Sequence, residues 1–261
     1  MRPSEWLAFG YFGVFAVAGL FQLRRNRSAW RTSALSLLGG AAAAVAPSVP
    51  AMALGGLAVP MRDWWLLVAL PLAYWAPAPL VRSADQRLEA RLLAADAAMG
   101  LGPAAGPSPL LELSYLLVYP MVPAGLAAVL NAGTITADTF WLATLVSVLP
   151  CYGLLPLLPT RPPRALPEPA VEVVTALSLT RQANVRFLDV FGNRWNTLPS
   201  GHAAGAAAVA LLVWRSGSPL GPAFLLLAAG IALGTVRGRY HYAVDTLLGV
   251  ALGLAAGLLT G

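Results

Sequence analysis

The sequence is poor in charged side chains and in the side chains that bind metals. Only 11% of its 261 residues are charged, whereas a soluble domain usually carries about 25%. This composition argues against a soluble protein. The single cysteine, Cys151, excludes an internal disulfide and a multi-cysteine metal site. The two histidines, His202 and His241, are too few for a zinc site unless carboxylates complete it.

Lysine is absent, so all 17 basic residues are arginine. The net charge of +6 would suit a nucleic-acid partner, but the arginines form short clusters between apolar runs and no groove-sized basic face. Charge in short loops normally orients a membrane protein instead. We expect no cleavable signal peptide, because Glu5 occupies the place of a positive n-region and no small-residue cleavage site follows.

Hydrophobic residues, in contrast, make up 58% of the chain, and the mean hydropathy is +0.69. At ~20 residues per spanning helix, this composition predicts an all-α fold, a polytopic integral membrane bundle of about six to eight transmembrane helices in the cell membrane. The window 33–59 contains prolines and a Gly-Gly pair and should be broken or tilted. The apolar windows are 6–23, 33–59, 64–81, 110–131, 139–158, 201–214, 219–236 and 244–260.

Two polar stretches interrupt the apolar windows. Residues 82–109 interleave charged residues with leucines and predict an amphipathic surface helix, followed by a Gly/Pro-rich turn. Residues 159–200 form the longest polar segment, and long connections are often functional. We divide the chain into residues 1–109, with N-terminal transmembrane helices and the surface helix, and residues 110–261, a catalytic transmembrane core.

The first histidine follows a helix-start signal. In Pro199-Ser200-Gly201-His202, Ser200 is a good N-cap, and the apolar run 203–214 follows. The free backbone N–H groups of a helix start bind anions, and Gly201 lets a phosphate approach the backbone closely. His202 should then stand beside the bound anion.

The second histidine has a carboxylate one helical turn later. His241 and Asp245 share a helical face, so Asp245 can fix the tautomer of His241 and leave its other nitrogen free as a nucleophile. Arg237 lies four residues before His241 and could face the same site, and Arg239 could do so if the backbone turns. Arg161, in Arg161-Pro162-Pro163-Arg164, is suited to bidentate phosphate contacts.

Taken together, the three motifs resemble the type 2 phosphatidic acid phosphatase superfamily of membrane lipid phosphatases and phosphotransferases, over roughly residues 110–260. The resemblance implies that His241 is the nucleophile that forms a phosphohistidine, that Asp245 orients it and that His202 protonates the leaving alcohol. It implies that Arg161, Ser200 and the Gly201 amide bind phosphoryl oxygens, with Arg237 and Arg239 as further candidates. It also implies that no metal and no cofactor are needed.

The sequence departs from the family pattern at three positions. Leu154 stands where the first motif has lysine, and Gly234 and Thr235 stand where the third motif has Ser-Arg. This variant is similar to the inositol phosphorylceramide synthase branch, which transfers a phosphoryl headgroup to another alcohol. A lipid phosphotransferase is therefore the alternative to a lipid-phosphate phosphatase.

Two further alternatives belong to other classes. A non-catalytic membrane lipid transporter or packing protein would also tolerate the missing lysine. A soluble vanadium haloperoxidase, which shares related motifs, is opposed by the composition. The expected partners are a membrane lipid phosphate or pyrophosphate and the bilayer, with no nucleic acid, and the sequence leaves the lipid and the oligomeric state open.

The predicted topology places all three motifs at one membrane face. The resemblance implies the extracytoplasmic face, and we expect the site there. The positive-inside rule, applied to Arg24, Arg25, Arg27 and Arg31 with simple alternation of the spans, would instead place the site in the cytoplasm.

Overall fold

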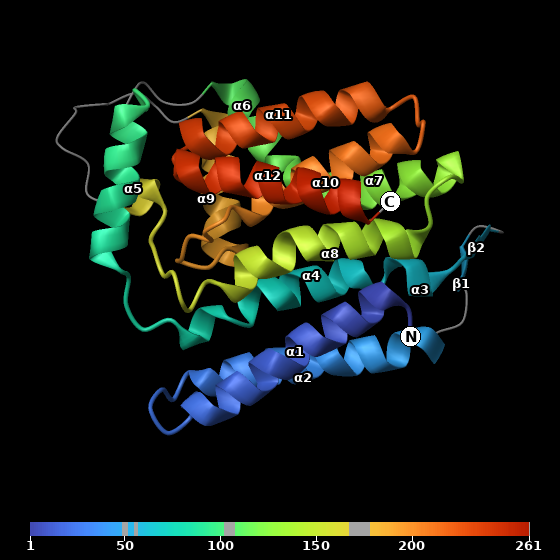
Figure 1. The fold of residues 1–261 in the computed structure, drawn as a ribbon, viewed down its shortest axis with the longest axis horizontal. Coiled ribbons are helices and arrows are strands. Elements are labelled where there is room, and N and C mark those ends of the chain that lie inside the picture. The colour runs from blue at the N-terminus through green and yellow to red at the C-terminus, as the bar shows by residue number, and fades with distance from the viewer. Residues whose placement is uncertain (49–51, 55–56, 102–107, 167–177, 261) are drawn as a thin grey trace.

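The computed structural model describes residues 1–48, 52–54, 57–101, 108–166 and 178–260, and the regular secondary structure of these residues is almost entirely helical. A two-stranded antiparallel hairpin pairs Met52 with Val59 and is the exception within them. The all-α class is therefore confirmed (Figure 1). The elements are α1 (Pro3–Gln22), α2 (Ala29–Val45), η1 (Ala46–Ser48), β1 (Met52–Leu54), β2 (Leu57–Val59), α3 (Met61–Trp64), α4 (Leu66–Trp75), η2 (Ala78–Leu80), α5 (Gln86–Ala98), α6 (Pro109–Leu116), α7 (Val118–Ala132), α8 (Ala137–Gly153), η3 (Pro163–Ala165), α9 (Leu179–Phe191), α10 (Gly201–Arg215), α11 (Gly221–Arg237) and α12 (Ala243–Leu259).

Each apolar window contains a helix, but most of these helices are short for a membrane span. Within the described ranges, α1 is the one helix that is long and apolar enough to cross a membrane by itself. The pair α6 and α7 passes the same test jointly, with a bend of 56° between them, and α11 and α12 are shorter apolar helices. One or two such helices are weak support for membrane association, so the count of six to eight spans stays a prediction.

Prolines explain where two windows are interrupted. Pro120 cannot donate a hydrogen bond to the carbonyl of Leu116, so the helix breaks at Leu117 between α6 and α7. The window 33–59 is divided into α2, a short 3-10 turn that contains Pro47, and the β1–β2 hairpin. The expectation that this window is broken is therefore confirmed.

The helices that run roughly along the long axis of the molecule include α1, α2, α4, α8, α10, α11 and α12 (Figure 1). Both chain termini lie at one end. At the opposite end α8 and α11 finish while α10 and α12 begin, and we call this the site end and the other the far end. The three sequence motifs, which lie in the segments that join these helices, are therefore brought to the site end.

Helix α10 lies at the centre of the bundle and contacts α7, α8, α11 and α12. Most of its alanines are buried. Helix α12 approaches it so closely that a Cβ on Gly253 would lie 2.2 Å from the carbonyl oxygen of Ala204, and one on Gly249 would lie 2.4 Å from that of Ser200. Small residues four apart allow such close helix packing, which places the start of α12 beside the start of α10.

The two polar stretches contain more structure than the sequence alone indicated. Helix α5 forms within 82–109, as expected, with Asp85 as its N-cap. The Gly/Pro-rich turn lies largely outside the described residues. The segment 159–200, expected as a long connection, contains the amphipathic helix α9, which Ser178 caps. Its apolar residues, Val185, Phe187, Leu188 and Phe191 among them, recur at helical spacing, and this spacing is the signal for α9 in the sequence.

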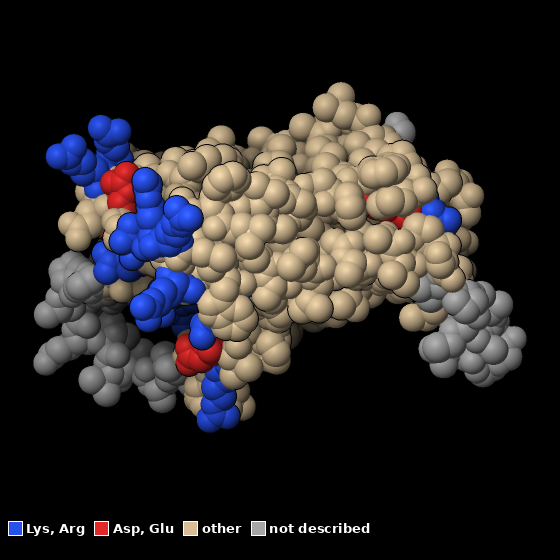
Figure 2. All heavy atoms as spheres, turned by 90° about the horizontal axis from the view of Figure 1, so that it is seen from below, with Lys and Arg blue, Asp and Glu red and all other residues tan. Residues whose placement is uncertain are grey.

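Charged residues gather at the two ends of the molecule, with an uncharged band between them (Figure 2). Arg2, Arg62 and Arg215 belong to elements at the far end, where Arg2 pairs with Asp63 and Arg62 with Glu5. The other arginines lie in segments at the site end, including the connection between α1 and α2 that contains Arg24, Arg25 and Arg27.

Candidate active site

Ser200 and the residues around it fix the position of His202. The Ser200 hydroxyl accepts a hydrogen bond from the Ala203 amide at 3.3 Å and thereby caps α10. The Ser200 amide donates to the Asp245 carbonyl at 2.9 Å, which ties the start of α10 to the first turn of α12. His202 follows in the first turn of α10, as its motif predicts.

Two tyrosines from the α6–α7 pair contact the His202 ring. Tyr115 stacks on it with 5.0 Å between ring centroids. The Nε2 atom of His202 lies 3.2 Å from the Tyr119 hydroxyl and 3.4 Å from the Tyr115 hydroxyl. These contacts orient the His202 ring. Neither tyrosine was identified from the sequence as part of the site.

His241 faces His202 from the turn between α11 and α12. The two ring centroids are 5.6 Å apart. The His241 ring is buried, and its Nδ1 lies 3.8 Å from Oδ2 of Asp245. This distance is too long for a hydrogen bond, and Nδ1 has no hydrogen-bond partner among the described residues. The structure thus brings together the two histidines and the aspartate that the sequence paired, with Asp245 on the Nδ1 side.

Asn196 was not identified from the sequence, although it stands within the stretch that leads to His202. Its Nδ2 donates to Oδ2 of Asp245 at 2.6 Å and to the Thr160 hydroxyl at 3.1 Å. The Tyr242 amide donates to the same Asp245 oxygen at 3.1 Å. The carboxylate is fully buried, so these two donors provide the compensation that a buried charge needs.

The arginines of the site are arranged differently from the sequence expectation. Arg161 turns to Glu89, and its Nε and NH2 hydrogen-bond the two carboxylate oxygens at 3.0 and 2.8 Å. Arg164, three residues later, lines a small cavity together with both histidines. Its guanidinium carbon lies 5.0 Å from the centre of the Tyr240 ring. Arg164 is therefore the arginine of the Arg-Pro-Pro-Arg segment that reaches the histidines.

The two arginines near His241 differ from each other. Arg239 has a φ of 56°, which is uncommon for a residue other than glycine. The backbone carbonyl of Arg239 accepts from the Arg164 amide at 3.0 Å, and its guanidinium Nη2 donates to the Pro163 carbonyl at 3.2 Å. Arg239 thus holds the Arg164 segment against the His241 turn. Arg237 ends α11, is exposed, and does not line the cavity between the histidines.

The packing around α10 requires a glycine at position 201. A Cβ at this position would lie 2.5 Å from the Tyr152 ring. The Gly201 amide donates to the Thr197 hydroxyl at 3.2 Å. A phosphoryl oxygen would have to compete with Thr197 for this amide, so its expected role in phosphate binding stays a prediction, as does that of the Ser200 hydroxyl.

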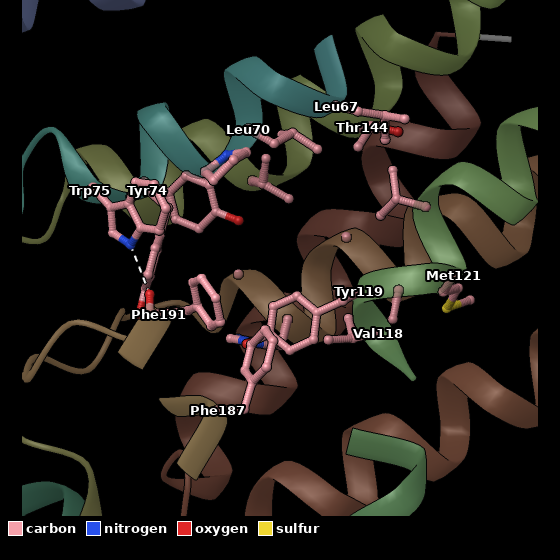
Figure 3. Close-up of a pocket in the computed structure, with 18 residues that line it drawn as sticks. Leu67, Leu70, Tyr74, Trp75, Val118, Tyr119, Met121, Thr144, Phe187 and Phe191 are labelled. Atoms are coloured by element: carbon pink, nitrogen blue, oxygen red, sulfur yellow. Dashed lines mark hydrogen bonds between the residues drawn. The ribbon is translucent and has the colours of Figure 1, made fainter. Parts of the chain in front are cut away.

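An apolar pocket of about 410 Å³ opens beside His202 (Figure 3). Its aromatic lining comes from Tyr74, Trp75, Tyr119, Phe187 and Phe191. The Trp75 indole N–H donates to the Phe191 carbonyl at 2.8 Å and joins α4 to α9. The remaining walls of the pocket are mostly aliphatic and come from α4, α7, α8 and α10. His202 lines both this pocket and the small cavity with His241.

Helix α5 supports the site from outside. Its Glu89 binds Arg161, and its Asp96 accepts from the Ala243 amide, at the first turn of α12, at 2.9 Å. Burial alone raises the pKa of Glu89, but the hydrogen bonds from Arg161 outweigh it and hold that pKa below its usual value. At Asp96 burial dominates and raises the pKa, because the Ala243 amide offsets it only in part. Helix α5 therefore contacts the segments that carry Arg161 and the first turn of α12, and the division of the chain at residue 110 stays a prediction.

Within the described ranges, no three histidine, cysteine, aspartate or glutamate side chains gather in a way that could hold a metal ion.

The family comparison gives a match to the model of the PAP2 superfamily over residues 90–259. The matched range begins inside α5 and includes both histidines and Asp245. It assigns no branch, so the resemblance to inositol phosphorylceramide synthases stays a prediction. Neither a curated protein nor a solved structure matches the chain.

Proposed function

The chain belongs to the PAP2 superfamily of phosphatases and phosphotransferases, and from this membership we propose that it is an integral membrane lipid-phosphate phosphatase that works through a phosphohistidine. The observation that supports this proposal best is the facing pair of His202 and His241, 5.6 Å apart between ring centroids, with the buried Asp245 carboxylate behind His241. In-line phosphoryl transfer needs a nucleophile on one side of phosphorus and a proton donor on the other, and this arrangement provides both.

In the proposed first step, the lone pair of His241 Nε2 forms a bond to phosphorus while the bond from phosphorus to the ester oxygen breaks. His202 gives a proton to the departing oxygen. In the second step, water attacks the phosphohistidine, the N–P bond breaks, and His202 takes the proton from the water. Asp245 keeps the proton of His241 on Nδ1, which leaves Nε2 free to attack.

Arginine neutralises the phosphoryl oxygens in this proposal. Arg164 is the first candidate because it lines the cavity that contains both histidines. Arg239 positions the Arg164 backbone. We assign Arg161 to the support of α5 through Glu89, in place of the direct phosphate contact that its motif suggested.

The apolar pocket beside His202 supports a lipid substrate. A phosphoryl group held between the histidines would leave the rest of the substrate next to this pocket, because His202 lines both cavities. Its aromatic and aliphatic walls provide a favourable environment for a hydrocarbon chain and none for a charged small molecule.

Phosphate release by the detergent-purified protein tests the proposal. We expect release from lipid phosphates or pyrophosphates, at the same rate with and without a chelator, and far slower release from glycerol phosphate, which has the ester but no chain. Equal rates for the lipid and the water-soluble ester would contradict the role of the pocket. No release from any substrate, together with formation of a new phospholipid when an alcohol-bearing lipid is added, would show a phosphotransferase instead.

We also propose that the eight apolar segments cross the membrane along the long axis of the molecule. The uncharged band between two charged ends supports this arrangement (Figure 2). The three motifs and the arginine-rich connection from α1 to α2 would then share one face. Family resemblance implies that this face is extracytoplasmic, and the positive-inside rule implies that it is cytoplasmic.

Single cysteines report this topology, because the native Cys151 is buried. Arg27→Cys and Arg194→Cys replace exposed residues at the site end, and Asn131→Cys replaces one at the far end. In whole cells, a membrane-impermeant maleimide should either label both site-end cysteines and not the far-end cysteine, or label the far-end cysteine and neither site-end cysteine. Labelling before permeabilisation at the site end would place the site outside the cytoplasm, and protection there would place it inside. Different behaviour of the two site-end cysteines would contradict the arrangement.

A further inference from the structure

Glu112 is a buried carboxylate that the proposed chemistry does not use. It lies on α6 and is 1% exposed. Its Oε1 accepts from Arg181 NH1 at 2.8 Å, and its Oε2 accepts from the Tyr240 hydroxyl at 2.5 Å. Asn184 Nδ2 donates to both Oε2 and the Glu112 carbonyl. A buried charge is tolerated only when it is paired and hydrogen-bonded in this way, so the cluster depends on the carboxylate being present.

The cluster joins three segments that are far apart in the sequence. Glu112 belongs to α6, Arg181 and Asn184 to α9, and Tyr240 to the turn that carries His241. Arg181 also donates to the Gly238 carbonyl at 2.8 Å, and its guanidinium carbon lies 4.9 Å from the centre of the Tyr240 ring. The turn is therefore held at Gly238 and at Tyr240, immediately before His241.

A stack of rings connects the same cluster to the other histidine. Tyr240 stacks on Tyr115 with 3.9 Å between ring centroids, and Tyr115 stacks on His202 with 5.0 Å. A displacement of Tyr240 would thus change the position of both histidine rings. The separation of these rings decides whether a phosphoryl group between them is in line with the nucleophile and the proton donor.

The cluster also fixes the wall of the apolar pocket. Phe187 lies on the same helix as Arg181 and Asn184, and its ring is 4.5 Å from that of Tyr119. Phe187 and Tyr119 both line the pocket (Figure 3). Helix α9 is amphipathic, and its polar contacts to Glu112 hold its aromatic residues in the pocket wall.

We infer that Glu112 is a positioning residue, which sets the separation of His202 and His241 through Tyr240 and docks α9 over the apolar pocket. The inference rests on the proposed function where catalysis is concerned. The geometric part of the inference is that Glu112 fixes the positions of the two histidine rings. This part can be tested whether or not the protein has the proposed activity.

Glu112→Gln and Tyr240→Phe test the inference, with Asp189→Asn as the matched control. The glutamine keeps the shape of Glu112 and removes its charge, and the phenylalanine keeps the ring stack and removes one hydrogen bond. Asp189 is an exposed carboxylate on α9 that does not line the pocket. We expect kcat to fall by about 10- to 100-fold in Glu112→Gln, by less in Tyr240→Phe, and not at all in Asp189→Asn. KM for a short-chain substrate should change little.

Histidine NMR gives a readout that does not depend on turnover. The chain contains two histidines, so His202→Ala assigns both sets of ring signals. Glu112→Gln and Tyr240→Phe should shift the ring signals of both histidines, and Asp189→Asn should leave them unchanged. If Glu112→Gln does not fold, Tyr240→Phe alone decides. Unshifted signals in a folded variant would overturn the inference. If the variants shift the signals but the native protein shows no turnover, only the proposed function would be overturned.

Discussion

Replacement of His241 by alanine should abolish phosphate release while leaving the fold intact. His241 is the proposed nucleophile, and no other described side chain offers a nucleophilic nitrogen facing His202 across the small cavity. Removal of a nucleophile lowers the rate by about 10⁴-fold or more, because the alternative is direct attack by water at an unactivated phosphoryl group. The ring lines the small cavity, and its Nδ1 has no hydrogen-bond partner among the described residues, so its loss should leave the fold intact.

A phosphoenzyme experiment makes this prediction specific. Brief incubation with a substrate labelled at phosphorus, followed by alkaline quenching, should leave label on the native protein, since phosphohistidine is stable to alkali and labile to acid. His241→Ala should carry no label. His202→Ala should still accept label from a substrate with a good leaving group, because that substrate needs no proton donor. Label that persists in His241→Ala would remove this residue from the mechanism.

Asp245→Asn should cause the second large loss. Oδ2 of Asp245 accepts from Asn196 and from the Tyr242 amide, so the asparagine should turn its carbonyl oxygen toward these two donors. This oxygen is also the one that lies 3.8 Å from Nδ1 of His241, so a neutral amide oxygen would face the ring where the carboxylate stood, and the NH2 group would take the place of Oδ1. Without the negative charge, the proton of His241 is no longer favoured on Nδ1, and the positive charge that the ring gains when Nε2 attacks phosphorus is no longer compensated. In Ser-His-Asp enzymes the replacement of the aspartate by asparagine costs about 10⁴-fold in kcat, and we expect a large loss here as well.

Asn196→Ala is the matched control for this prediction. It removes one donor to Asp245 and leaves the carboxylate in place, so kcat should fall much less than in Asp245→Asn. The ring 15N signals of His241 should show the proton on Nδ1 in the native protein and a loss of this preference in Asp245→Asn. Equal kcat in the native protein and Asp245→Asn would remove the His–Asp pair from the mechanism.

The sequence alone predicted the parts of the site that depend on local order. Ser200 caps α10 because a short hydroxyl side chain before an apolar run satisfies the free amides of a helix start. The sequence also paired His241 with Asp245, but it placed both on one helical face, whereas His241 stands in the turn before α12 and only Asp245 lies on the helix. The apolar windows predicted the helices because the length and continuity of an apolar run can be read from the sequence itself.

The tertiary structure decided which polar side chains meet. The motif favoured Arg161 for the phosphate contact. The position of Glu89 on α5 determines that Arg161 is bound there, while Arg164 reaches the histidines. Asn196 and Asp245 are 49 residues apart, and Glu112 and Tyr240 are 128 residues apart. A buried carboxylate must find its donors wherever packing places them. That packing depends on the close approach of α10 and α12 at Gly249 and Gly253, which no local pattern specifies.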